Sequence, residues 1–200
     1  MVFFKDKILQ KKLKGYWSII PSVQIHEIMG ISGFDFGIID LEHGTYSFQE
    51  ALESVIAIKR SGMDALIRPS SHDEKEILRC LELGVDGLCI PHIKTINEAK
   101  SVLSFAKYPP QGIRGASGFT RATRYGADKF NDHVSKSNKS IFISLLIESM
   151  EGLNNAKEIA MLDGVDNLYF GTYDIASSIG DSNQKGEKVK KLVKDTIDKI

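Results

Sequence analysis

Polar residues that can do chemistry occur in five short segments, each close behind an apolar run. The segments are 40–44, 68–70, 91–92, 148–149 and 171–174. If the apolar runs are parallel strands, these segments follow the carboxyl ends of the strands, which meet at one edge and carry the active site in α/β proteins. The segments supply carboxylates, histidines and an arginine. We therefore expect one active site at this edge.

Glu148 and Asp174 follow two consecutive runs, 141–147 and 168–171. Neighbouring parallel strands lie about 4.8 Å apart, so both carboxylates can bind one cation. Oxygen ligands favour a hard divalent ion such as magnesium or manganese. Two protein ligands leave positions for water and for a chelating substrate, as at catalytic metal sites. The structural alternative is a pair of exposed carboxylates or helix N-caps.

His43 and Arg68 are predicted to act on the substrate. His43 stands in the segment Asp40-x-Glu42-His43, where a neighbouring carboxylate can fix the imidazole tautomer and raise its basicity, as a general base requires. Arg68 offers a planar guanidinium to a carboxylate or enolate oxygen, and Pro69 restricts its backbone. An ion pair between Arg68 and Asp40 or Glu42 is the structural alternative, and it is compatible with catalysis.

Segment 109–126 differs from the rest of the chain because it is rich in glycine, proline and arginine. It is too long for a simple turn, and loops of this kind often bind ligands. Further candidates for the site are His92 and three arginines of this segment: Arg114, Arg121 and Arg124. Each arginine either binds the far carboxylate of a longer substrate or holds the segment to the fold.

The elements that position these residues follow from a repeated phrase, Gly-x-Asp, at 33–35, 62–64, 84–86 and 164–166. Glycine ends helices because it adopts the left-handed conformation, and the apolar run that follows suits a strand buried on both faces. The pattern predicts six strands, give or take one, at 16–20, 34–40, 65–69, 87–91, 141–147 and 168–171. Amphipathic helices are predicted at 48–60, 73–83, 96–106, 150–161 and 184–200.

Strands that alternate with helices predict a parallel sheet with crossover helices. No Gly-x-Gly-x-x-Gly follows a strand and no Gly-Lys-Ser/Thr occurs, so the sequence marks of nucleotide-binding open sheets are missing. The predicted fold class is therefore α/β, a TIM-type (β/α) barrel. About six of its eight strand–helix units are present, in a single domain over residues 1–200.

Composition excludes several kinds of protein. The 200 residues are 42% hydrophobic and 26% charged, as in an ordinary globular domain. Because the formal net charge is zero, neither nucleic acid nor a membrane surface is an expected partner. Cys80 and Cys89 are too few and too oddly spaced for a disulfide framework or a cysteine metal site. The lysine-rich N-terminus has no signal-peptide core, so we expect a cytoplasmic protein.

These motifs, in this order, resemble those of the HpcH/HpaI aldolase family. That family comprises metal-dependent class II pyruvate aldolases and relatives that act on 2-keto-3-deoxy sugar acids. The resemblance extends from about residue 15 to residue 200. It rests on the motifs 33–36 and 40–43, 108–115, 147–149, and 164–166 and 171–174.

The resemblance implies the roles of the site residues. In that family the residues that match Glu148 and Asp174 bind the metal. The one that matches His43 belongs to the acid/base machinery, and the one that matches Arg68 steadies the enolate. The further residues expected at the site are Asp40 in the catalytic group, and Gly171, Thr172, Tyr173 and Arg114 around the substrate.

The resemblance also implies the reaction. A divalent metal (magnesium, manganese or cobalt) would bind the keto and carboxylate oxygens of a 2-oxo acid, while His43 moves a proton directly or through water. The C3–C4 bond of a 2-oxo-4-hydroxy acid is then cleaved or formed, to or from pyruvate and an aldehyde.

The sequence departs from the family pattern at three positions and in length. Leu146 stands where a glutamine is usual, Thr172 replaces proline and Ala176 replaces serine, which affects substrate identity more than chemistry. A (β/α)₈ barrel takes about 250 residues, so strands seven and eight are expected to be missing. The chain is then a truncated product, a fragment or a barrel completed by a partner. Open sheet edges favour association, so we expect a homo-oligomer and a poorly active isolated chain.

Three other functions are open. A thioester lyase of the citrate-lyase or malyl-CoA type shares the metal carboxylates, but the chain leaves little room for a nucleotide site. A non-catalytic binding protein would keep the site residues without a closed barrel. A Schiff-base aldolase is disfavoured because predicted strands five and six contain no lysine and Lys94 lies in a loop.

Overall fold

The computed structural model describes residues 2–200. Six strands form one sheet in the order β1-β2-β3-β4-β5-β6, and every neighbouring pair is parallel. The strands are β1 (Gly15–Ser18), β2 (Phe36–Asp40), β3 (Asp64–Arg68), β4 (Gly87–Ile90), β5 (Phe142–Ile147) and β6 (Asn167–Phe170). The sheet is an open half-barrel, so the predicted partial TIM-type barrel of the α/β class is confirmed. Each strand end lies within two residues of its predicted position.

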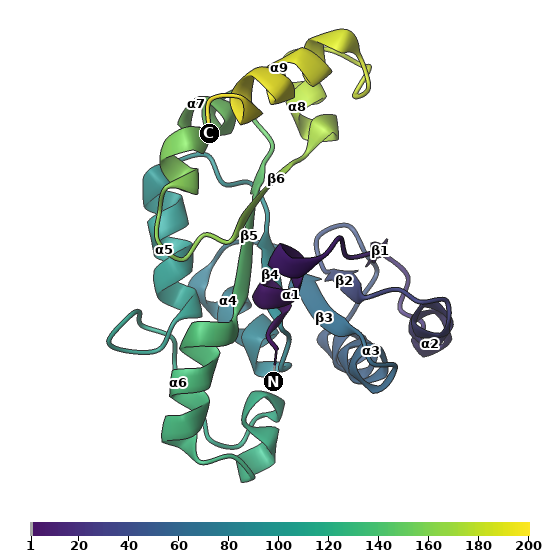
Figure 1. Cartoon of the computed structure of the whole chain (residues 1–200), viewed down its shortest axis with the longest axis vertical. Helices are drawn as coiled ribbons and strands as arrows, with labels where there is room; N and C mark the ends of the chain where they lie inside the picture. The colour runs from purple at the N-terminus through teal and green to yellow at the C-terminus, as the bar shows by residue number, and fades with distance from the viewer. Residues whose placement is uncertain (1) are drawn as a thin grey trace.

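The helices pack mainly on the outer face of the sheet, whereas the first of them lies on the concave face (Figure 1). They are α1 (Phe4–Gln10), α2 (Val23–Ile31), α3 (Phe48–Arg60), α4 (Glu74–Glu82), α5 (Ile96–Ala106), α6 (Phe130–Ser140), α7 (Met150–Ala160), α8 (Thr172–Ser178), α9 (Glu187–Ile197) and the 3-10 helix η1 (Arg121–Gly126). The five predicted helices form α3, α4, α5, α7 and α9. Within residues 2–200, no helix has the length and apolar character needed to span a bilayer.

The repeated Gly-x-Asp phrase marks the step from each helix to the next strand. The four glycines Gly33, Gly62, Gly84 and Gly164 have φ values of 79°, 81°, 72° and 99°. This is the left-handed conformation that the sequence predicts, and side chains with a Cβ rarely adopt it.

Three of the aspartates in this phrase tie a strand to its predecessor. Each lies directly before a strand, and its Oδ2 accepts a backbone N–H within one residue of the first residue of the preceding strand. The bonds join Asp35 to Lys14 at 2.8 Å, Asp86 to Ala65 at 2.9 Å and Asp166 to Ile143 at 2.8 Å. The phrase therefore supplies both a helix end and a strand alignment.

Two apolar cores lie on the two faces of the sheet. The larger one fills the space between the sheet and the outer helices and includes Ile39, Ile67, Ile90, Leu145, Val55, Ile77, Val102 and Ile159. The smaller one lies on the concave face and consists of Phe4, Ile38, Leu66, Cys89, Phe142 and Leu146. Central strands bury side chains on both faces, as β5 does at all six positions, so they appear in the sequence as continuous apolar runs.

Helix α1 fills the amino-terminal end of the concave face. The ring centroid of Phe4 lies 5.1 Å from that of Phe36 and 4.9 Å from that of Phe142, both in edge-to-face contact. Nearer the carboxyl ends, the rings of Trp17 on β1 and Tyr169 on β6 are 5.8 Å apart. The first and last strands thus approach each other through aromatic side chains, while their outer edges pair with no other strand among residues 2–200.

Candidate active site

Asp40 ends β2 and builds the turn that carries the next site residues. It is 2% exposed, and its Oδ1 accepts the backbone N–H groups of Glu42 at 3.0 Å and His43 at 3.2 Å. Burial acts to raise the pKa of Asp40, but hydrogen bonds from Arg68 and from these N–H groups outweigh it and hold the pKa below its ordinary value. Asp40 is therefore a charged anchor at the carboxyl end of the sheet.

Arg68 ends β3 directly beside Asp40 in the ladder. Its Nε and Nη2 donate to the two oxygens of Asp40 at 2.8 and 2.5 Å, and its Nη1 lies 2.9 Å from Glu42 Oε2. The guanidinium also lies over the ring of Trp17, 4.7 Å from its centroid. These contacts fix the guanidinium plane, which an arginine needs to present its N–H groups to a carboxylate or enolate oxygen.

Glu148 follows β5 and is 6% exposed. Its Oε2 accepts the backbone N–H of His92 at 3.0 Å. A Cβ at Gly171 would lie 2.6 Å from Glu148 Oε1, so the carboxylate packs directly on the glycine backbone. Burial raises the pKa of this carboxyl above its ordinary value, and the nearby carboxylates of Glu42 and Asp174 add to the effect.

Asp174 lies in the first turn of α8 and lines the same cavity as Glu148. Besides burial, the charges of neighbouring carboxylates raise the pKa of Glu148, and a divalent cation would neutralise such charge, so Glu148 and Asp174 fit a hard, oxygen-bound metal. In the part of the chain that the structure describes, no three His, Cys, Asp or Glu side chains are grouped to hold a metal. A metal held by these two carboxylates would keep positions for water and substrate.

The cavity at the carboxyl ends of the strands has a volume of about 540 Å³. Its lining residues are Trp17, Asp40, His43, Arg68, Leu146, Glu148, Tyr169, Phe170, Gly171, Thr172, Tyr173 and Asp174. The side chain of His43 is 63% exposed, and its Nε2 lies 3.8 Å from Glu42 Oε2. His43 is thus accessible to a molecule in the cavity. Of the residues expected in the catalytic group, at the metal or around the substrate, all line this cavity except Arg114. The further candidates His92, Arg121 and Arg124 also lie outside its lining.

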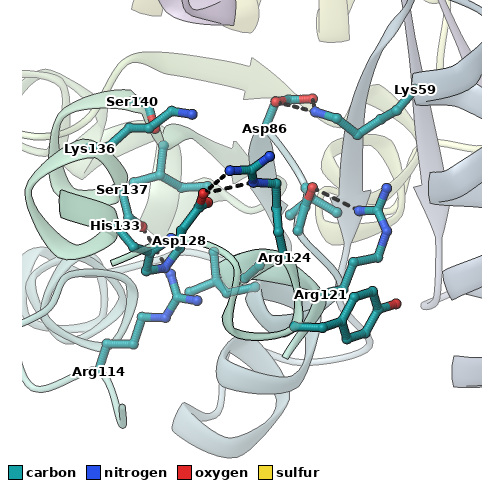
Figure 2. Close-up of a pocket in the computed structure, with 16 residues that line it drawn as sticks. Lys59, Asp86, Arg114, Arg121, Arg124, Asp128, His133, Lys136, Ser137 and Ser140 are labelled. Atoms are coloured by element: carbon teal, nitrogen blue, oxygen red, sulfur yellow. Dashed lines mark hydrogen bonds and ion pairs between the residues drawn. The ribbon is translucent and has the colours of Figure 1, made fainter. Parts of the chain in front are cut away.

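Arg114 lies in a second cavity, of about 360 Å³, away from the predicted site (Figure 2). Its Nη2 donates to Glu82 at 2.9 Å, its Nη1 donates to Ser137 at 3.2 Å, and its guanidinium lies over the ring of Tyr108. These partners hold the segment after α5 against α4 and α6. The chain therefore does not bring Arg114 to its own site, and a substrate contact by this residue has no support in its position.

The second cavity lies at the amino-terminal end of the strands, where Asp86 precedes β4. Its arginines and one lysine have structural partners. Lys59 pairs with Asp86 at 2.7 Å, Arg121 donates to the carbonyl of Leu83 at the end of α4 at 2.6 Å, and Arg124 pairs with Asp128 (Figure 2). The contacts of Arg114 and Arg121 support the predicted role of holding segment 109–126 to the fold, whereas Arg124 makes a local pair.

His92 and Glu42 contact residues that line the cavity, although neither lines it itself. The ring of His92 lies between the carboxylates of Glu42 and Glu148, and Glu42 is also paired with Arg68. Both residues stand in polar segments directly after strands, so their position was the available signal. Nothing in the sequence indicates that the two side chains meet, because the contact depends on how β2 and β4 are placed in the sheet.

Comparison with known proteins identifies the family of the chain. A sequence profile described as HpcH/HpaI aldolase/citrate lyase matches residues 14–197. The chain is 34% identical over 187 residues to the hydroxypyruvate/pyruvate aldolase of Sagittula stellata, an alignment that covers 93% of this chain and 73% of that protein. It is also 34% identical over 178 residues to the 5-keto-4-deoxy-D-glucarate aldolase of Enterobacter sp. (strain 638), covering 88% and 69%.

The fold agrees with these sequence relationships. The crystal structure of the HpcH/HpaI aldolase from Desulfitobacterium hafniense DCB-2 matches with a TM-score of 0.90 at 27% identity, covering 100% of this chain and 78% of that chain. The profile covers most of the sequence, and the two curated relatives are aldolases. On the strength of its motifs, its fold and these matches, the chain belongs to the HpcH/HpaI aldolase/citrate lyase family.

Proposed function

We propose that the chain is a class II pyruvate aldolase, a divalent-metal-dependent carbon–carbon lyase. It would cleave or form a 2-oxo-4-hydroxy acid, to or from pyruvate and an aldehyde. The observation that carries the proposal is that one cavity is lined by two carboxylates, Glu148 and Asp174, and by an arginine, Arg68, whose guanidinium is held in place by an ion pair. A 2-oxo acid suits such a cavity, because its oxygen atoms can bind a metal and its negatively charged oxygen can accept hydrogen bonds from a guanidinium.

Glu148 and Asp174 are the residues that would hold the metal. When bound there, magnesium, manganese or cobalt supplies Lewis acidity that stabilises negative charge on the oxygen of the 2-oxo group. The packing of Glu148 on Gly171 and its hydrogen bond from His92 keep one of the two carboxylates in a single orientation.

Arg68 binds the carboxylate or enolate oxygen of the substrate in this proposal. Asp40 and Glu42 hold its guanidinium in place before substrate enters, so little reorganisation is needed when charge develops. Asp40 has a second role, because the same carboxylate fixes the turn that carries His43.

His43 is the residue that moves the proton. In the cleavage direction it accepts the proton of the C4 hydroxyl, directly or through one water, as the C3–C4 bond breaks and its electron pair passes into the enolate. Its exposed ring lines the cavity, with Glu42 as the nearest carboxylate.

Gly171, Thr172 and Tyr173 border the cavity beside Glu148, and we infer that they contact the substrate. Leu146 and Trp17 add apolar surface to the same cavity. This surface suits the hydrocarbon part of a small 2-oxo acid better than a further polar group.

Pyruvate release from a 4-hydroxy-2-oxo acid, measured with and without EDTA, tests the proposal. Release is expected to stop with EDTA and to return when Mn²⁺ is added. Glu148→Gln is expected to lose both Mn²⁺ binding and activity, while Glu158→Gln, the same change on an exposed part of α7, is the matched control. Pyruvate release that persists in EDTA would refute the metal-dependent mechanism. Mn²⁺ binding without any lyase activity would favour the non-catalytic alternative, and turnover of an acyl-CoA substrate would favour the thioester lyase.

A further inference from the structure

His92 stands in an unusual backbone conformation at the end of β4. Its φ is 56°, in the left-handed region that only a few per cent of residues other than glycine adopt, with asparagine, aspartate and histidine the most frequent among them. The next residue again makes a backbone hydrogen bond to β5, since the Ile93 N–H donates to the carbonyl of Leu146 at 3.1 Å. Strained residues of this kind cluster at functional sites.

The conformation brings two nitrogens of His92 to one oxygen of Glu148. The backbone N–H donates to Oε2 at 3.0 Å, and Nδ1 of the ring lies 3.2 Å from the same atom. The other ring nitrogen, Nε2, lies 2.8 Å from Glu42 Oε1. Glu42 is in turn 2.9 Å from Nη1 of Arg68 through its second oxygen. One imidazole thus connects the carboxylate proposed for the metal with the arginine proposed for the substrate.

We propose that His92 is a positioning residue that couples the two halves of the site, holding Glu148 for the metal and, through Glu42, Arg68 for the substrate. The inference rests on the proposed function, because it takes Glu148 as a metal ligand. It assigns a role to a residue that touches neither the metal nor the substrate.

The geometry favours this role over direct ligation of the metal. Both ring nitrogens of His92 face carboxylates, so no ring nitrogen is left to face the space between Glu148 and Asp174. His92 is also outside the set of described residues that line the cavity. Residues that orient a metal ligand in this way commonly change metal affinity by about 10–100-fold when they are replaced.

Two substitutions separate the contacts of His92. His92→Gly accepts the left-handed backbone and keeps the N–H donor to Glu148, but removes the ring. We expect its Mn²⁺ affinity, measured by EPR titration, to fall about 10–100-fold. His92→Asn also tolerates this backbone, and its amide nitrogen can take the place of Nδ1 but cannot reach Glu42. We expect it to recover most of the Mn²⁺ affinity while the KM for the 2-oxo acid, at saturating Mn²⁺, stays raised about tenfold.

His72→Ala is the matched control, because it removes a histidine that is outside this network. It is expected to keep wild-type Mn²⁺ affinity and KM. Circular dichroism confirms that each variant is folded, and if His92→Gly is not, the split between Mn²⁺ affinity and KM in His92→Asn decides the question alone.

The outcomes distinguish this inference from the proposed function. If wild type binds no Mn²⁺, or Glu148→Gln binds it as tightly as wild type, the metal site itself is wrong. Suppose instead that wild type binds Mn²⁺ and Glu148→Gln binds it more weakly. The role of His92 is then refuted if His92→Gly has the Mn²⁺ affinity and the KM of wild type. If His92→Gly does not fold, the same result for His92→Asn refutes it. Nitrogen modulation from a coordinated imidazole in the pulsed EPR spectrum of bound Mn²⁺, lost in His92→Gly, would also overturn it, because His92 would then be a ligand.

Discussion

Gly171→Ala tests how closely Glu148 depends on the backbone beside it. The added methyl would lie 2.6 Å from both Cγ and Oε1 of Glu148, whereas ordinary contacts begin at 3.4 Å. The carboxylate must therefore withdraw by about 1 Å, and a displacement of that size costs on the order of 10²-fold in rate at a catalytic site. We expect kcat/KM for pyruvate release to fall by about that factor, with weaker Mn²⁺ binding.

The substitution is expected to act locally. Gly171 has φ −82° and ψ 91°, which alanine can adopt, so the backbone is not strained by the change. The contact involves one side chain that can rotate away, and overpacking of this kind destabilises by about 1–3 kcal/mol. The protein should therefore remain folded at assay temperature.

Steady-state kinetics at saturating Mn²⁺ and an EPR titration measure the two effects. Gly118→Ala is the matched control, because a Cβ at Gly118 meets no atom within 4 Å, and it should retain wild-type values. A folded Gly171→Ala protein with wild-type kcat/KM and Mn²⁺ affinity would refute the reasoning, since the added methyl would then not displace the carboxylate of Glu148.

Four further outcomes are expected. His43→Ala lowers kcat by about 10²–10⁴-fold and keeps Mn²⁺ affinity; unchanged kcat would place the base elsewhere. Asp40→Asn breaks the buried pair with Arg68 and destabilises the fold by about 3 kcal/mol at neutral pH. The pKa of Asp40 in the folded protein is below its ordinary value of 3.8. The extra free energy of unfolding of wild type is therefore complete above pH 3.8 and is lost as pH falls through the folded pKa. Urea unfolding should show the two proteins converging only in that acid range, and convergence near neutral pH would contradict it. Borohydride with pyruvate should trap no adduct by mass spectrometry, because no lysine lines the cavity among the described residues; an adduct on Lys94 would indicate an imine mechanism. Light scattering should show an oligomer, because the outer edges of β1 and β6 are unpaired among residues 2–200, and a fully active monomer would exclude that.

The elements that the sequence predicted are those whose burial follows a simple period. Helix α3 was predicted at its observed bounds because its buried positions recur at helical spacing. Helix α2 was missed because several of its apolar residues are exposed, as Ile28 and Ile31 are, and it fully buries only His26. Helix α6 was missed because polar side chains fill its buried positions. Asn138, for example, exchanges hydrogen bonds with the backbone of Tyr108.

The site could be predicted as far as strand ends determine it. Glu148, Arg68 and Asp40 were predicted as site residues because each ends or follows an apolar run, and the parallel sheet brings them to one cavity. The contacts of His92 could not be predicted, since they join it to residues 50 or more positions away in the chain. The position of Arg114 outside this cavity could not be predicted for a related reason, because its partner Glu82 belongs to another helix.

The aspartates directly before β2, β4 and β6 act as register markers for the sheet. A slip of one residue would separate each carboxylate from its backbone N–H and would turn the side chains of the strand to the opposite face. Each aspartate bonds to the strand before its own, so one side-chain hydrogen bond inside each of the pairs β1–β2, β3–β4 and β5–β6 aligns its two strands. The half-barrel is thus built from three self-aligned modules, and a module moved to another place in such a barrel would bring its own alignment with it.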